Sequence, residues 1–308
     1  MKPDIIIICG PTGIGKTSAT ISLAKAFNGE IINADSMQLY RHMDIGTAKP
    51  NPDERAEVAH HIVDMITPDT PFDAAKFAVT ADALISDFIK KGITPFIAGG
   101  TGLYIKSLVD GLFRANPANP ETIKRLTEES ENDGPQILFD RLLSCDPKAA
   151  EKIHPNDTFR IIRALETFET TGQPISEHHN QHNFADRSYR VLKIGLSMER
   201  ERLYDRINRR VDLMIEEGLL KEVKALIEMG YDPALKSMKS LGYRHMVEYI
   251  QGITDWSEAL RTLKRDTRRY AKRQMTWFRS DSEIEWFPPE NTGEISQRIK
   301  RFLQGQSN

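Results

Sequence analysis

Residues 5–17 read IIIICGPTGIGKT, and the expected architecture follows from them. They begin with a short apolar, β-branched run that is typical of a central strand in a parallel sheet. The run leads into a glycine-rich turn, after which residues 18–27 carry apolar side chains at helical spacing. Residues 30–34 form a second strand-like run, so the order strand, loop, helix, strand predicts an α/β fold.

The glycine-rich turn matches the phosphate-loop pattern G-x-x-x-x-G-K-[ST] and lies between a predicted strand and a predicted helix. Its members are Gly10, Pro11, Thr12, Gly13, Ile14, Gly15, Lys16 and Thr17. The glycines let several backbone N–H groups converge on an anion, while Lys16 adds positive charge and Thr17 offers a hydroxyl to Mg²⁺. A plain turn with a solvated helix start is the alternative. The pattern does not reveal which phosphorylated compound binds, because nucleotides and simple diphosphates present the same oxygens.

A second glycine-rich turn follows another predicted strand. Residues 74–91 have helical periodicity, and residues 94–98 read as a strand that runs into Gly99-Gly100-Thr101-Gly102. The strand at 30–34 likewise ends in a polar loop that begins at Asp35. Because such loops gather at the carboxyl edge of a parallel sheet, the sequence predicts a site there.

The stretch 115–189 differs from its surroundings, being polar and helical in period without strand-like runs. We interpret it as an all-helical domain inserted into a core of 1–114 and 190–308. That core is expected to be a parallel sheet of the P-loop NTPase type, flanked by helices. Residues 191–196 return to the sheet, and 203–229 and 257–278 are each predicted to form one long helix.

The composition is that of a folded protein with little overall charge. The 308 residues have a formal net charge of -2, and two cysteines are too few for a disulfide framework. The apolar run near the N-terminus is too short for a signal peptide, so we expect a cytoplasmic protein. A charge near zero argues weakly against a nucleic-acid partner unless positive charge is concentrated locally.

Positive charge is concentrated on the predicted helix 257–278. Its cations are Lys264, Arg265, Arg268, Arg269, Lys272 and Arg273, while Leu260, Leu263, Thr267, Tyr270, Ala271 and Gln274 mark its other side. Such a face could neutralise nucleic-acid phosphates, and its binding would then weaken with salt. An ordinary solvated helix surface is the alternative.

Short motifs along nearly the whole chain carry a family resemblance. They are DSMQLY at 35–40, DIGTAKP at 44–50, HHIVD at 60–64, GGTGLY at 99–104, ND at 156–157, RIIRALE at 160–166, LGYR at 241–244 and RRYAKRQ at 268–274. In this order and spacing they resemble the bacterial tRNA dimethylallyltransferases. One departure is Gly13-Ile14, where the family usually has alanine and serine. No paired cysteines follow Trp286, unlike the zinc finger of many eukaryotic relatives.

The resemblance implies transfer of a dimethylallyl group from dimethylallyl diphosphate to N6 of the adenosine at position 37 of tRNA, just 3′ of the anticodon. The products would be N6-isopentenyladenosine and diphosphate. The amine must lose a proton, and by resemblance Asp35 is the base. Thr101 resembles the family threonine that contacts the target nucleotide and the departing phosphates. Capping of a helix is the alternative for both residues.

By the same resemblance the phosphate loop holds the diphosphate, with Mg²⁺ as the cofactor bound at Thr17. Arg206 and Arg210 are four residues apart and share a helix face, so we expect one of them to reach the diphosphate. The sequence does not choose between these two arginines.

The implied tRNA contacts are spread over the chain. They are Asp35, Ser36, Met37, Gln38, Thr101, Phe159, Arg160, Ile161, Ile162, Arg163, Gly242, Tyr243, Arg244, Arg269, Lys272 and Arg273. The adenosine is expected to leave its stack and enter a pocket lined by 35–38, while the inserted domain contacts the anticodon stem-loop. We expect the protein to be a monomer.

Two other classes of function fit parts of the sequence. A P-loop kinase would use ATP, but such kinases carry an acidic residue where the strand 96–98 leads to glycines. A noncatalytic RNA-binding module would leave the phosphate loop without a use.

Two groups of histidines have no assigned role. His178, His179 and His182 lie close enough in sequence for a metal site, but their polar surroundings favour surface of the insertion. His60 and His61 belong to a family motif without a role that the sequence defines.

Overall fold

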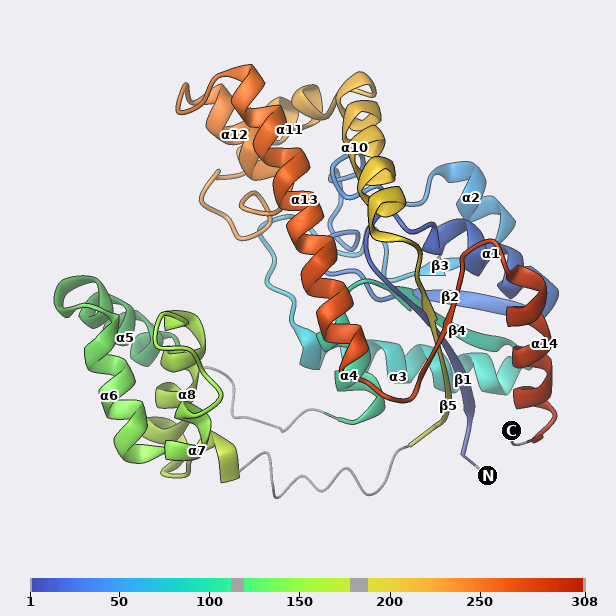
Figure 1. Cartoon of the computed structure of the whole chain (residues 1–308), viewed down its shortest axis with the longest axis horizontal. Coiled ribbons are helices and arrows are strands. Elements are labelled where there is room, and N and C mark those ends of the chain that lie inside the picture. The colour runs from blue at the N-terminus through green and yellow to red at the C-terminus, as the bar shows by residue number, and fades with distance from the viewer. Residues whose placement is uncertain (1, 112–118, 178–187, 307–308) are drawn as a thin grey trace. The chain divides into compact units, whose positions relative to one another are not determined.

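The computed structural model describes residues 2–111, 119–177 and 188–306, and Figure 1 draws the chain. Its contacts divide the chain into two compact units, one of Met1–Val109 with Ser188–Asn308 and one of Asp110–Arg187. The second unit occupies the region in which the sequence predicts an inserted domain at 115–189. His178, His179 and His182 lie outside the described residues.

Six parallel strands form one sheet in the first unit, in the order β3-β2-β4-β1-β5-β6. Their bounds are β1 Asp4–Cys9, β2 Gly29–Asn33, β3 His60–His61, β4 Thr94–Gly99, β5 Arg190–Leu196 and β6 Ile284–Phe287. In the central strand β1, Ile6 is paired with Phe96 of β4 and with Leu192 of β5. The predicted parallel α/β sheet is confirmed. The shared direction brings the loops after β1, β2 and β4 to one edge.

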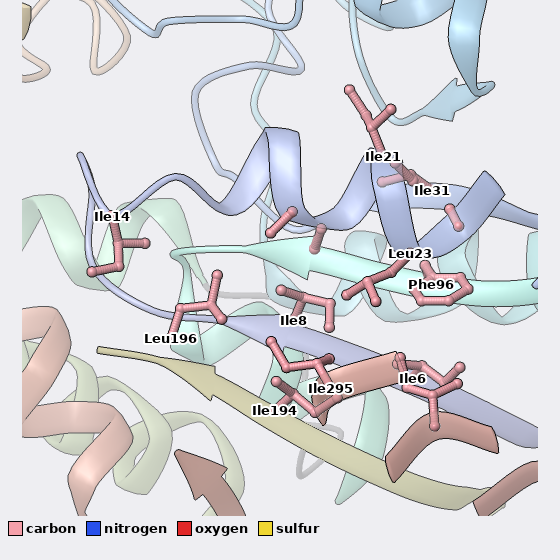
Figure 2. Packing of buried hydrophobic residues seen from close by; sticks show 14 of the residues in the cluster. Ile6, Ile8, Ile14, Ile21, Leu23, Ile31, Phe96, Ile194, Leu196 and Ile295 are labelled. Carbon is pink, nitrogen blue, oxygen red and sulfur yellow. The ribbon is translucent and has the colours of Figure 1, made fainter. Parts of the chain in front are cut away.

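Several helices of the first unit pack on the sheet and complete its core, while others pack on helices (Figure 1). Those described in the first unit are α1 Lys16–Ala26, α2 Pro52–Glu57, α3 Ala74–Lys91, α4 Gly102–Val109, α10 Arg200–Glu216, α11 Leu219–Glu228, α12 Tyr243–Ile250, α13 Trp256–Arg279 and α14 Thr292–Leu303. Figure 2 shows Ile8, Leu23 and Ile295 in one buried cluster, to which β1, α1 and α14 contribute. Within the described ranges, no helix has the length and apolar character that crossing a bilayer requires.

The region 203–229, predicted as one long helix, forms two helices. α10 ends at Glu216 and α11 begins at Leu219, with Gly218 between them at φ +103°. Glycine adopts this left-handed conformation without the steric cost that a side chain adds, so it ends the first helix. Apolar residues continue on both sides of the break, which is why periodicity alone does not reveal it.

The second unit is built from helices with a core of their own. Those with described bounds are α5 Pro120–Asp133, α6 Pro135–Cys145, α7 Pro147–Ala150 and α8 Thr158–Thr171. Leu126, Leu138 and Leu142 pack in this core together with Ile161 and Ile162. Ile161 is fully buried and Ile162 is only 8% exposed, so their side chains belong to this core, and contact of this segment with tRNA stays a prediction.

Candidate active site

The phosphate loop joins β1 to α1 at the carboxyl edge of the sheet. Gly15 takes φ +101° immediately before α1, a left-handed conformation that glycine adopts readily. The ammonium of Lys16 donates to the carbonyl oxygens of Gly10 and Pro11, each at 2.9 Å. The lysine is therefore folded over its own loop, where it would meet an anion held by the loop N–H groups.

Two cations beside this loop have lowered pKa values. Burial lowers the pKa of Lys16 to about 8, and the carboxylate of Asp35 acts against that shift. Burial also lowers the pKa of Arg210, again with Asp35 acting in the opposite direction. Withdrawal from water disfavours the charged form of a base. A bound anion would stabilise both cations and would itself be favoured by them.

A cavity of about 190 Å³, the phosphate cavity, lies beside the loop. Lys16 and Thr17 line it from the start of α1, Arg210 from α10 and Asp35 from the loop after β2. These four residues give the cavity two cations, a hydroxyl and a carboxylate, and Glu54 adds a second carboxylate to its lining. The cations and the hydroxyl suit a phosphorylated ligand, and the carboxylate of Asp35 could accept a proton from a group bound beside it.

Asp35 stands just beyond the end of β2 and has two sets of neighbours. Its Oδ1 accepts the backbone N–H of Met37 at 2.9 Å, which fixes the turn. Asp35 also lines both the phosphate cavity and a larger cavity next to it. The backbone contact typical of a capping residue is present, and it does not remove this carboxylate from the site.

The residues that follow Asp35 divide between the cavities. Ser36 and Met37 line the larger cavity, and Gln38 lines the phosphate cavity. The side-chain amide of Gln38 donates to the carbonyl oxygens of Thr47 and Ala48, both at 3.1 Å. Gln38 therefore holds the neighbouring loop in place, in addition to facing a cavity.

Hydrogen bonds join the loop after β2 to the loop after β4. The N–H of Ser36 donates to the hydroxyl of Thr101 at 3.0 Å, and the N–H of Thr101 donates to the carbonyl of Ala34 at 3.1 Å. A Cβ at Gly99 would lie 2.1 Å from that Ala34 oxygen, so the close approach requires glycine. Thr101 lines neither cavity, and its contact with substrate stays a prediction.

The larger cavity has a volume of about 500 Å³ and adjoins the phosphate cavity. Thr12, Asp35, Thr47 and Arg210 line both. Further walls come from α10, from residues 239–242 and from α13. Asp35 therefore lies where the phosphate cavity meets the larger cavity, whose volume is usual for small-molecule sites.

The structure distinguishes the two arginines that the sequence leaves equivalent. Arg210 lines both cavities, and its guanidinium donates to the hydroxyl of Thr12 at 3.2 Å. Arg206 donates to the carbonyl of Gly13 at 3.0 Å and lines neither cavity. The geometry therefore favours Arg210 as the ligand contact, with Arg206 bracing the loop backbone.

The cations of α13 are partly neutralised by acidic neighbours. The carboxylate of Asp266 accepts from Arg265 at 2.8 Å and lies 3.6 Å from Arg269. In the part of the chain that the structure describes, Lys272 and Arg273 form no ion pair. Arg269 and Arg273 line the larger cavity, whereas Lys272 does not.

The turn before α12 enters the site only in part. Gly242 and Arg244 line the larger cavity. Tyr243 is fully buried, and its hydroxyl donates to Glu222 at 2.5 Å. Its ring packs against Gly46, where an added Cβ would lie 2.4 Å away. The side chain of Tyr243 therefore supports the site from within the protein, and its contact with tRNA stays a prediction.

In the second unit, the remaining predicted RNA contacts differ in exposure. The side chain of Phe159 is 80% exposed. Arg160 is also on the surface, in an ion pair with Asp157 at 2.7 Å. Arg163 pairs with Glu166, whose side chain is only 1% exposed. Phe159 and Arg160 remain accessible to RNA, whereas Arg163 has a partner inside its own unit.

Gln274 has a function in the site that the sequence motifs do not indicate. Its side-chain oxygen accepts the N–H of Thr12 at 2.8 Å, and its side-chain nitrogen donates to the carbonyl of Gly100 at 2.9 Å. One buried amide thus ties α13 to both glycine-rich loops. In the sequence, this role was indicated by the presence of a polar residue on the buried side of an amphipathic helix.

Two further side chains were also missed. Glu222 accepts the backbone N–H groups of residues 44–46 at 2.8 to 3.1 Å, so it holds the loop that forms part of both cavities. His60 lines the phosphate cavity, with Nδ1 2.8 Å from the carbonyl oxygen of Val58. That contact leaves Nε2 as the ring nitrogen for a ligand.

Comparisons with known sequences agree on one family. The family model described as IPP transferase matches residues 38–281, and the one described as isopentenyl transferase matches residues 3–64. A tRNA dimethylallyltransferase of Desulfosudis oleivorans is 49% identical over 304 residues, covering 98% of this chain and 97% of that protein. A tRNA dimethylallyltransferase 2 of Syntrophus aciditrophicus is 50% identical over 306 residues, covering 99% and 98%.

Solved structures have the same fold. The full-length tRNA isopentenylpyrophosphate transferase from Bacillus halodurans matches with a TM-score of 0.74 at 41% identity, covering 99% of this chain and 98% of that one. A eukaryotic dimethylallyltransferase acting on tRNA matches with a TM-score of 0.84 at 28% identity, covering 99% and 80%.

Proposed function

The chain belongs to the IPP transferase family, and from that premise we propose that it transfers a dimethylallyl group from dimethylallyl diphosphate to N6 of adenosine 37 of tRNA. The products are N6-isopentenyladenosine and diphosphate. One observation carries this proposal: Asp35 and Arg210 line both the phosphate cavity and the larger cavity beside it. Relatives 49% and 50% identical over nearly the whole chain, both named as tRNA dimethylallyltransferases, support the same reaction.

The phosphate loop binds the diphosphate of the donor. Backbone N–H groups at the start of α1 and the ammonium of Lys16 converge on it, and Arg210 contacts it from α10. When the carbon–oxygen bond breaks, the electron pair stays on the diphosphate. Cations already in place stabilise that charge without reorganisation, which lowers the barrier.

Asp35 is the base. As the bond between the allylic carbon and N6 forms, the amine loses a proton, which the Asp35 carboxylate accepts. Met37 donates to this carboxylate at 2.9 Å, and Thr101 holds the adjoining Ser36 N–H at 3.0 Å. Thr101 is therefore placed to position the loop that carries the base.

Magnesium fits the donor set of the phosphate cavity. Thr17 supplies a hydroxyl oxygen on its wall, while Asp35 is left free to act as the base. Mg²⁺ prefers oxygen ligands and usually completes its shell with substrate phosphates and water. Bound there, the ion would neutralise charge on the leaving diphosphate.

The larger cavity receives the adenosine after it has left its stack. Tyr270 offers an aromatic ring on its wall, and Arg269 and Arg273 offer cations for the neighbouring backbone. We also propose that Phe159 and Arg160 contact the anticodon stem-loop. The enzyme is proposed to act as a monomer in the cytoplasm.

The test supplies unmodified tRNA with either labelled dimethylallyl diphosphate or labelled ATP. We expect label from the prenyl donor in the nucleoside 3′ of the anticodon, and none from ATP. Productive use of ATP with the prenyl donor untouched would mean a kinase. Binding of tRNA without either transfer would mean a noncatalytic RNA-binding module.

A further inference from the structure

A third cavity, of about 240 Å³, lies on another face of α13 from the larger cavity. Leu263 and Tyr270 of this helix line the larger cavity, whereas Lys272 and Arg279 line the third. At about 100° per residue, these two pairs point in opposite directions from the helix axis. α13, the long helix in Figure 1, thus forms a wall of both cavities.

The third cavity combines an apolar floor with an aromatic ring. Leu203 and Ala271 are buried in the core and form part of the floor. Tyr204 lines the cavity from α10, and the guanidinium of Arg200 stands over its ring at 5.1 Å from the centroid. Because Tyr204 also packs against the hydrophobic core, the surface that it offers a flat ligand is the guanidinium plane held over its ring.

The rim of the third cavity is cationic and unneutralised. Arg200, Lys272 and Arg279 form no ion pair with any residue that the structure describes. By contrast Arg202, two residues along α10 from Arg200, pairs with Glu290 at 3.0 Å. None of the described residues lining the cavity is acidic. An apolar floor with an unpaired cationic rim complements a ring that carries phosphate.

We propose that the third cavity binds a second nucleotide of the tRNA, distinct from the adenosine that is modified. Its base packs on the guanidinium of Arg200, which Tyr204 supports from beneath, and its phosphate contacts Arg279. Stacking and phosphate neutralisation are the interactions by which proteins hold unpaired RNA nucleotides. The proposal rests on the proposed function, which supplies the RNA.

The geometry gives this nucleotide a place separate from the prenyl donor. The third cavity includes Pro11 of the phosphate loop but neither Lys16 nor Thr17. The third cavity can therefore hold a nucleotide while the phosphate loop holds the diphosphate.

The test measures tRNA binding by variants of the third cavity. Arg200→Ala combined with Arg279→Ala should raise the Kd for an unmodified anticodon stem-loop about tenfold and reduce the salt slope by about 1 per lost phosphate contact. Tyr204→Ala should weaken binding about tenfold because the guanidinium of Arg200 loses its support, while Tyr204→Phe should keep nearly full affinity.

Controls separate this site from the rest of the protein. Arg202→Ala removes a neighbouring arginine of the same helix that does not line the cavity, and its tRNA Kd and salt slope should stay unchanged. The Kd for inorganic diphosphate should be the same in all these variants, because the phosphate loop is intact. Thermal melting confirms that each variant is folded.

Two outcomes would overturn the proposal. One is an unchanged tRNA Kd and salt slope in the folded Arg200→Ala, Arg279→Ala variant. The other is binding of free AMP that this variant loses while its tRNA affinity is kept, which would mark a site for a free nucleotide. If the wild type instead binds the stem-loop through these residues but transfers no prenyl group, the proposed reaction fails and the nucleotide site stands.

Discussion

The phosphate loop and the face of α13 toward the larger cavity both present cations to the substrates, but they hold them differently. Lys16 in the loop is withdrawn from water, and its pKa is lowered to about 8. On this face of α13, Arg269 lies 3.6 Å from the carboxylate of Asp266, which also accepts from Arg265 at 2.8 Å on another side of the helix. A desolvated cation gains most from a small anion that contacts it directly, whereas paired surface cations adjust affinity for a large polyanion. The loop should therefore govern donor binding, and α13 should govern RNA binding.

Asp35 lies at the junction of the two regions. Its replacement should lower the rate of prenyl transfer without changing the affinity for the donor or for tRNA. Asp35→Asn keeps the shape of the side chain and an oxygen for the Met37 N–H but removes the base. The rate of transfer should fall about 100-fold to 10,000-fold, the range of general base catalysis. Single-turnover assays measure the rate, and binding assays measure the Kd of tRNA.

Asp35→Ala should likewise abolish transfer while tRNA binding persists. Asp69→Asn is the matched control, since Asp69 is exposed and lines neither the phosphate cavity nor the larger cavity. Loss of tRNA affinity with an intact chemical rate in the Asp35 variants would assign this residue to binding.

The lowered pKa of Lys16 makes donor binding sensitive to pH. Below about pH 8 the ammonium is present, and above it the free protein loses that charge, so affinity for an unreactive prenyl diphosphate analogue should decrease as pH rises from 7 to 9. Lys16→Met should weaken binding about 100-fold, the value of a strong charged contact of about 3 kcal/mol. Calorimetric titration across this pH range measures both effects.

The Lys16→Met variant is also the control for pH, because its weak residual binding should not change through the same window. The free energy of unfolding of the ligand-free wild type should instead increase as pH rises. A lysine pKa lowered from 10.5 to about 8 in the folded protein makes its contribution to stability rise between these two pH values. Equal pH dependence of binding in wild type and variant would remove Lys16 from the anion site.

The difference between the phosphate loop and α13 also explains which features the sequence could predict. Residues 10–17 are contiguous and act largely through backbone geometry, so a local pattern identifies them. The parallel sheet also follows from local order, because alternating strands and helices leave few other arrangements. The break at Gly218 was missed because apolar spacing continues through it.

The larger cavity is assembled from distant segments, and there the motifs were less informative. A motif names residues that occur together, but it does not separate a residue that faces the cavity from one that supports it. Gly242 lines the cavity while the adjacent Tyr243 is buried beneath the site. Similarly, the partner of Lys264 is Asp212 of α10, at 2.6 Å, which a helical wheel of α13 cannot reveal. Likewise, the sequence could not show whether Arg206 or Arg210 contacts the diphosphate, because this depends on how α10 passes the phosphate loop.

Gln274 connects the two regions and gives the smallest of these expected effects. Gln274→Leu would leave the Thr12 N–H and the Gly100 carbonyl without their side-chain partner, at a cost of about 1 to 3 kcal/mol in stability. The melting temperature should fall, and the KM for the prenyl donor should rise about fivefold as the loop loosens. Gln251→Leu, the same change at an exposed position, should alter neither quantity. If Gln274→Leu raised the KM for tRNA and left the donor KM unchanged, α13 would act on RNA alone and the amide would not couple it to the phosphate loop.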